Sequence, residues 1–78
     1  MAAEEGLRAC VPLARRAAEL EDKLYELGVN PRKALADLAY LAEKGDPRFP
    51  DALRAWVEFR RARSELLRCV RSIVAGGP

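Results

Sequence analysis

The sequence predicts an all-α protein, and three observations lead to that expectation. Alanine (14 residues) and leucine (11) dominate the apolar part of the 78-residue chain, and both favour helices. Apolar residues recur at steps of three and four in two long stretches, and no stretch alternates apolar and polar residues as a strand would. Proline and glycine divide the chain into three helical parts. We therefore expect a single helical domain over residues 1–78: an antiparallel hairpin of the first and third helices, plus a short middle helix.

The first helix is expected over about residues 3–28, where Gly28 provides a stop signal. Pro12 lies within this stretch. Because proline lacks an N–H, it cannot bond to the Arg8 carbonyl and should kink the helix at that point. The alternative is a helix that begins at Pro12, with residues 2–11 forming a separate turn.

The middle helix is expected over residues 31–44. Asn30 is a favourable capping residue, and Pro31 suits the first helical position, where its missing N–H costs nothing. Gly45 follows the last helical residue, as is common at helix C-termini. The helix would therefore have about four turns.

The third helix is expected over residues 51–74. The prolines at positions 47 and 50 interrupt any helix before it, and the Asp51 carboxylate favours the positive end of the new helix. Gly76, Gly77 and Pro78 follow its end. An alternative fold is an up-down-up bundle in which the first and third helices run parallel. A middle helix of about 21 Å would then leave the end of a helix of roughly 36 Å uncovered.

A continuous apolar seam runs along the first helix and another along the third. Antiparallel pairing with partner numbers that sum to 79 keeps every step in register and gives each layer the composition of an antiparallel coiled coil. The flanking charges agree, since Arg16 and Lys23 fall beside Glu65 and Glu58. The paired layers are Cys10 with Cys69, Leu13 with Leu66, Ala17 with Ala62, Leu20 with Phe59, Leu24 with Ala55 and Leu27 with Ala52.

The two cysteines, Cys10 and Cys69, meet at one level of this register and are candidates for a disulfide. A bridge that closes a loop of roughly 60 residues would add about 4 kcal/mol of stability in the chain-entropy model. The alternative is that both thiols are small buried apolar groups.

Apolar residues remain beyond the seam at the end of the hairpin that the middle helix is too short to reach. An exposed apolar patch commonly marks an interface, so we expect a protein partner here, with a homodimer as the first choice. The predicted function is therefore a small helical protein-interaction or oligomerisation module, an accessory subunit of a larger assembly. The candidate interface residues are Leu7, Val11, Leu67, Val70 and Val74.

The third helix carries most of the positive charge of a chain whose net charge is +2. A row of arginines on one helix can follow the phosphates of a nucleic acid, which makes nucleic-acid binding the alternative function. The other interpretation is a solvated face, because Arg54 and Arg61 each precede a glutamate by four residues. The candidate nucleic-acid residues are Arg54, Arg60, Arg61, Arg63, Arg68 and Arg71.

The composition argues against enzymatic chemistry. The chain has no histidine, no threonine and no glutamine, and its only serines are Ser64 and Ser72. Without imidazole there is no Ser-His or Cys-His couple and no histidine metal ligand. Phosphate-binding glycine loops and paired C-x-x-C motifs are also missing. We expect no enzymatic activity, no cofactor, no metal and no small-molecule substrate.

The sequence predicts a cytoplasmic protein with no membrane association. No apolar run approaches the roughly 18 residues of a membrane span, and the first residues lack the basic and apolar regions of a secretory leader. The lack of glutamine, the single asparagine and the many charged residues are typical of thermophilic proteins. An intracellular disulfide would fit that setting.

Overall fold

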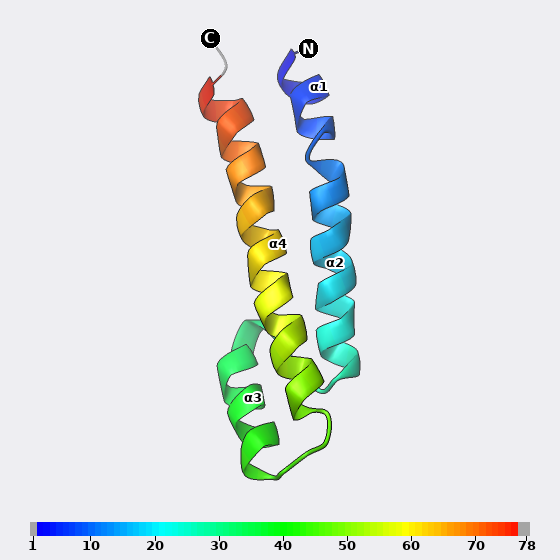
Figure 1. Cartoon of the computed structure of the whole chain (residues 1–78). Helices are drawn as coiled ribbons and strands as arrows, with labels where there is room; N and C mark the ends of the chain where they lie inside the picture. The colour runs from blue at the N-terminus through cyan, green and yellow to red at the C-terminus, as the bar shows by residue number, and fades with distance from the viewer. Residues whose placement is uncertain (1, 77–78) are drawn as a thin grey trace.

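The computed structural model describes residues 2–76, and these residues form helices and no strand, which confirms the all-α fold. Figure 1 shows a long hairpin with both ends of the chain at one tip, and α3 beside the first part of α4 at the other tip. The molecule measures 52 × 17 × 15 Å. In chain order the elements are α1 (Ala2–Arg8), α2 (Val11–Glu26), the 3-10 helix η1 (Pro31–Lys33), α3 (Ala34–Glu43) and α4 (Phe49–Gly76).

Helix α2 packs along α4 and runs antiparallel to it, as the seam predicts (Figure 1). The disulfide between Cys10 and Cys69 fixes the register in which partner numbers sum to 79. The same register continues into α1, because a Cβ placed on Gly6 would lie 3.0 Å from Cγ2 of Ile73. The absence of a side chain at Gly6 lets α1 approach α4 closely. The hairpin, and not the up-down-up bundle with parallel first and third helices, is therefore the observed arrangement.

The predicted first helix is divided into α1 and α2, which corrects the expectation of one kinked helix over residues 3–28. The amides of Ala9 and Cys10 bond to the carbonyls three residues before them, at 3.0 and 2.9 Å, and this tighter turn separates the two helices. Pro12 lies in the first turn of α2, where no N–H is needed. In a straight continuous helix its ring would clash with the Arg8 carbonyl.

Helix α2 ends in a Schellman motif centred on Gly28, which has φ = 84°. The Val29 amide donates to the Leu24 carbonyl at 2.8 Å, and the Gly28 amide donates to the Tyr25 carbonyl at 3.1 Å. Val29 itself is buried in the core beside Leu24. The motif therefore reverses the chain and adds an apolar side chain to the core.

Asn30 caps the next segment, as predicted: its Oδ1 accepts a hydrogen bond from the Arg32 amide at 2.9 Å. The Asn30 amide donates to Oδ2 of Asp37 at 2.8 Å, which ties this turn to α3. The predicted helix over 31–44 begins as the 3-10 helix η1 and continues as α3. Gly45 follows α3 in a second Schellman motif, with φ = 64°.

Asp46 and Arg48 form a compact ion pair in the loop between α3 and α4. Oδ1 of Asp46 accepts from the Arg48 amide at 2.8 Å and from its Nε at 3.1 Å, and Oδ2 accepts from Nη2 at 2.9 Å. The side-chain hydrogen bonds from Arg48, followed by the bond from its amide, lower the pKa of the Asp46 carboxyl. Because Phe49, the first residue of α4, follows Arg48 directly, this ion pair orders the loop immediately before the helix.

Helix α4 begins at Phe49, two residues before the predicted start, and extends to Gly76, two residues beyond the predicted end. The early start is allowed because Pro50 lies in the first turn, where a missing N–H breaks no helical bond. Gly76 is helical and does not act as the stop. The other two predicted stop residues, Gly77 and Pro78, lie outside the described residues.

The buried apolar residues concentrate at the α3 end of the hairpin. The main cluster joins residues of α2, α3, the α2–η1 turn and the first part of α4, and Phe59 connects it to a smaller cluster formed by Ala17, Leu20 and Ala62. In the part of the hairpin between Ala17 and the termini, Cys10 is the only buried apolar residue among those that the structure describes. The main cluster contains Leu24, Val29, Ala34, Leu38, Leu41, Ala52 and Ala55.

Substitution of Gly28 by alanine is expected to destabilise the protein more than substitution of Gly45. Both positions have positive φ, so each alanine should cost roughly 1–2 kcal/mol in backbone conformation. At Gly28 the new Cβ would also lie 3.2 Å from Nη1 of Arg48, whose guanidinium Asp46 holds in place, whereas nothing lies within 4 Å at Gly45. Urea denaturation of the two variants measures the difference, and equal losses would contradict this account of the turn.

Candidate functional site

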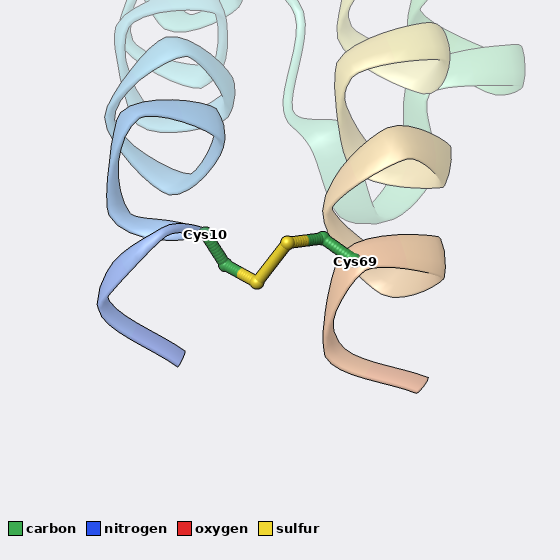
Figure 2. Close-up of a disulfide and its surroundings, with 2 residues drawn as sticks. All are labelled: Cys10 and Cys69. Carbon is green, nitrogen blue, oxygen red and sulfur yellow. A yellow bond between two sulfur atoms is a disulfide. The ribbon is translucent and has the colours of Figure 1, made fainter. Parts of the chain in front are cut away.

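A disulfide crosses the hairpin near the end that carries the termini. Figure 2 shows Cys10, at the break between α1 and α2, bonded to Cys69 of α4. The sulfur atoms are 2.10 Å apart and the Cα atoms 5.9 Å. Of the two alternatives for these cysteines, the structure therefore has the bridge, at the level that the register predicts. The bridge holds the two sides of the open end together.

The five candidate interface residues lie around this disulfide. Leu67 and Val74 on α4 are 42% and 66% exposed, Val11 is also exposed, and Leu7 and Val70 are half-buried. Leu7 and Val11 each follow a residue that faces α4, namely Gly6 and Cys10. Val70 and Val74 follow the partners of those residues, Cys69 and Ile73.

Positions that follow the seam residues fall on the same side of an antiparallel pair, because a two-fold axis relates its helices. Leu7 and Val11 therefore share one side of the hairpin with Val70 and Val74. Leu67 joins them one turn before Val70. We call this surface, made of Leu7, Val11, Leu67, Val70 and Val74, the apolar side.

Helix α3 covers the continuation of the same side at the other end of the hairpin. Trp56, Arg60 and Arg63 of α4 line a groove together with η1 and the start of α3. Seven residues bring a helix back to nearly the same face, so Arg60 precedes Leu67 and Arg63 precedes Val70 on one face of α4. The apolar side thus begins where the cover provided by η1 and α3 ends.

The opposite side of the hairpin is charged. Arg16 lies beside Glu65, as predicted, but its ion pair, at 3.5 Å, is with Glu58. Arg16 lies in a groove with both glutamates, and its long side chain reaches the one nearer α3. Lys23 shares a second groove with Glu58, as predicted. Both members of the ion pair are more than half exposed, so the pair contributes little stability.

The structure separates the six candidate nucleic-acid arginines into distinct surroundings. Arg54 pairs with Asp51 at 3.7 Å, not with the glutamate four residues later, because Glu58 pairs across the hairpin. Arg60 lies over the Trp56 ring, with its Cζ 5.0 Å from the ring centroid. Arg63 shares the groove of Trp56 and Arg60. The remaining three, Arg61, Arg68 and Arg71, are exposed on α4.

Two further basic residues, Arg32 and Lys33 of η1, line the same groove as Arg60 and Arg63. Sequence reasoning did not single them out, because they stand about 30 positions before the α4 arginines. The one available signal was their place directly after the Asn30 cap and Pro31, which fixes them at the start of a helix.

Among residues 2–76, no group of three or more histidine, cysteine, aspartate or glutamate residues is arranged to hold a metal ion. None of the helices in this range combines the length and the apolar character needed to cross a bilayer. Comparison of the chain with protein-family models, curated proteins and solved structures gives no match. The geometry described above is therefore the basis for a functional proposal.

Proposed function

We propose that this protein is a small helical interaction module that forms a homodimer through the apolar side. The observation that carries the proposal is that η1 and α3 cover this face of the hairpin at one end, whereas the apolar side at the other end is uncovered and exposes Val11, Leu67 and Val74. Exposed apolar residues that gather on one side of a small domain commonly mark an interface.

A second copy of the chain fits the apolar side. In a two-fold dimer the same patch meets itself, and an apolar patch is complementary to a copy of itself. Two hairpins that join at their open ends would form a four-helix core, with the two α3 helices outside the contact. Helix α3 also limits how far the two hairpins can overlap. Function as an accessory subunit of a larger assembly would use the same rigid surface.

The disulfide supports this use of the surface. It joins Cys10 to Cys69 directly beneath the apolar side, so Val11 of one helix and Val70 of the other are held in a fixed relation. A preformed surface loses less conformational entropy on binding than a flexible one.

Replacement of two residues of the apolar side by glutamate is expected to abolish the dimer. In Leu67→Glu/Val74→Glu, four carboxylates would meet in the dimer contact, and the dimer should weaken roughly hundredfold or more. Sedimentation equilibrium at micromolar concentrations measures the association of the wild type and of the variant.

The double variant Leu35→Glu/Val57→Glu is the matched control. Leu35 and Val57 are 70% and 46% exposed and lie outside the apolar side, so this variant introduces the same charge and should dimerise like the wild type. Circular dichroism confirms that both variants remain helical. A wild type that sediments as a monomer throughout, or a control that dissociates equally, contradicts the proposed homodimer.

A further inference from the structure

A groove between η1, the start of α3 and the middle of α4 gathers positive charge. Its volume is about 290 Å³, and four basic side chains line it, two from η1 and two from α4. They are Arg32, Lys33, Arg60 and Arg63. We call this feature the basic groove.

No acidic side chain lines the basic groove among the residues that the structure describes. Asp37 of α3 is the acidic residue nearest to η1 in sequence, and its carboxylate accepts the Asn30 amide at 2.8 Å. The other side of the hairpin differs, because Arg16 there shares its groove with Glu58 and Glu65. The repulsion among the four cations of the basic groove is therefore not balanced by lining residues of the protein.

The fold brings these cations together, and local sequence does not. Arg32 and Lys33 reach the groove because the Gly28 turn and the Asn30 cap send the chain back along α4. Arg60 and Arg63 lie within the middle of α4. The cluster thus depends on two elements that meet only in the folded protein.

An aromatic ring supports the groove. Trp56 is partly buried against the main core cluster and also lines the groove. The guanidinium of Arg60 lies 5.0 Å from its ring centroid, a distance at which cation–π attraction restrains the side chain. A guanidinium that is already oriented loses less entropy when its remaining N–H groups bind a ligand.

We propose that the basic groove binds a phosphate group, carried by a nucleotide or by a nucleic-acid strand. A phosphate presents several oxygens at once and can accept forked hydrogen bonds from more than one arginine. A single carboxylate offers two oxygens and balances less of the charge of four cations. This proposal differs from a simple row of arginines on α4, because it includes η1 and leaves out Arg68 and Arg71. It is also independent of dimer formation.

The single tryptophan of the chain, Trp56, provides a direct readout. Titration with pyrophosphate, and separately with a short single-stranded oligodeoxynucleotide, should change its fluorescence in a saturable way at low salt. Added salt should weaken binding of the oligodeoxynucleotide, because phosphate contacts release counterions. If both probes bind, a strand or a nucleotide can supply the phosphate. If pyrophosphate alone binds, the ligand is a small phosphate compound. Either outcome supports the phosphate site.

Substitutions distinguish this groove from general surface charge. Arg32→Ser and Arg63→Ser should each weaken binding about tenfold or more, because each removes charged hydrogen bonds to the ligand. Arg68→Ser and Arg71→Ser remove the same charge outside the groove and should leave the affinity nearly unchanged. All four residues are exposed, so circular dichroism should show unchanged folding. The Leu67→Ala/Val74→Ala variant weakens the dimer contact without adding charge beside the groove and should still bind, which separates this test from that of the dimer.

Three results would overturn the proposal. The first is the absence of any fluorescence change, together with no heat of binding by calorimetry for either probe at low salt. The second is an equal loss of affinity in the Arg68→Ser and Arg71→Ser controls. The third is binding of polyglutamate as tight as that of the oligodeoxynucleotide and with the same dependence on Arg32 and Arg63, since this would show that the groove recognises negative charge and not phosphate.

Discussion

Reduction of the disulfide between Cys10 and Cys69 is expected to lower the free energy of unfolding by about 4 kcal/mol. The two cysteines are 59 residues apart, so the bridge closes most of the chain into one loop. In the chain-entropy model, opening such a loop returns a large conformational entropy to the unfolded state. For a domain of 78 residues, this is a large part of the whole stability.

The loss should be greatest at the end of the hairpin that carries the termini. The buried core lies mainly at the other end, around Leu24 and α3, and α1 contacts α4 through the small residue Gly6. Alanines at positions 17 and 62 bring α2 and α4 close together but bury little apolar area. Without the bridge, α1 and the last turns of α4 should exchange their amide hydrogens much faster than the helices around Leu24.

The comparison that isolates the bridge is between oxidised and reduced wild-type protein in urea, because it changes no other side chain. The Cys10→Ser/Cys69→Ser variant should resemble the reduced protein, with an added cost for placing a hydroxyl at the buried position 10. Equal stability of the oxidised and reduced proteins would show that the bridge does not constrain the chain in this way.

The sequence was most informative about the pairing of the two long helices. Heptad spacing fixes which residues of each helix face the partner, and one register also brings Cys10 opposite Cys69. The structure has this register, and Gly6 opposite Ile73 extends it into α1. Apolar periodicity identifies the two facing seams but allows several registers, and the coincidence of the two cysteines selects this one.

The sequence was less informative about how the helices begin and end. Pro12 indicates a disturbance, but the choice between a kink and a break depends on whether the turn at Ala9 and Cys10 can form other hydrogen bonds, and it does. Pro50 predicts an interruption before the third helix, whereas in the structure it occupies the first turn of α4. In both cases a proline allows two local structures, and the hydrogen bonds that the neighbouring amides form decide which one is present.

The ion pairs and the basic groove depend on distances that heptad spacing does not give. Arg16 reaches Glu58 because a long side chain can bridge neighbouring layers, and this leaves Arg54 to pair with Asp51. The meeting of Arg32 with Arg63 depends on the path of the turn after Gly28. A sequence pattern within one helix carries no information on that path.

The second large effect is expected from Leu24→Ala, which should lower the free energy of unfolding by about 3 kcal/mol or more. Leu24 is fully buried, with 0% of its surface exposed, and belongs to the cluster that joins α2, α3 and α4. Removal of its side chain leaves a cavity within this cluster, which also contains Val29 and Ala55. Since alanine at position 55 cannot fill that space, the cavity should not collapse, and the full cost of lost contacts should remain.

Leu35→Ala provides the matched control, because Leu35 lies on α3 and is 70% exposed. The same atoms are removed, but from a side chain already in water, so stability should change little. Both variants are measured in urea with the disulfide intact, which keeps the unfolded state equally constrained. If Leu24→Ala and Leu35→Ala reduced stability equally, burial at the α3 end would not be the main source of packing energy. The disulfide would then be expected to hold together a hairpin with no dominant core.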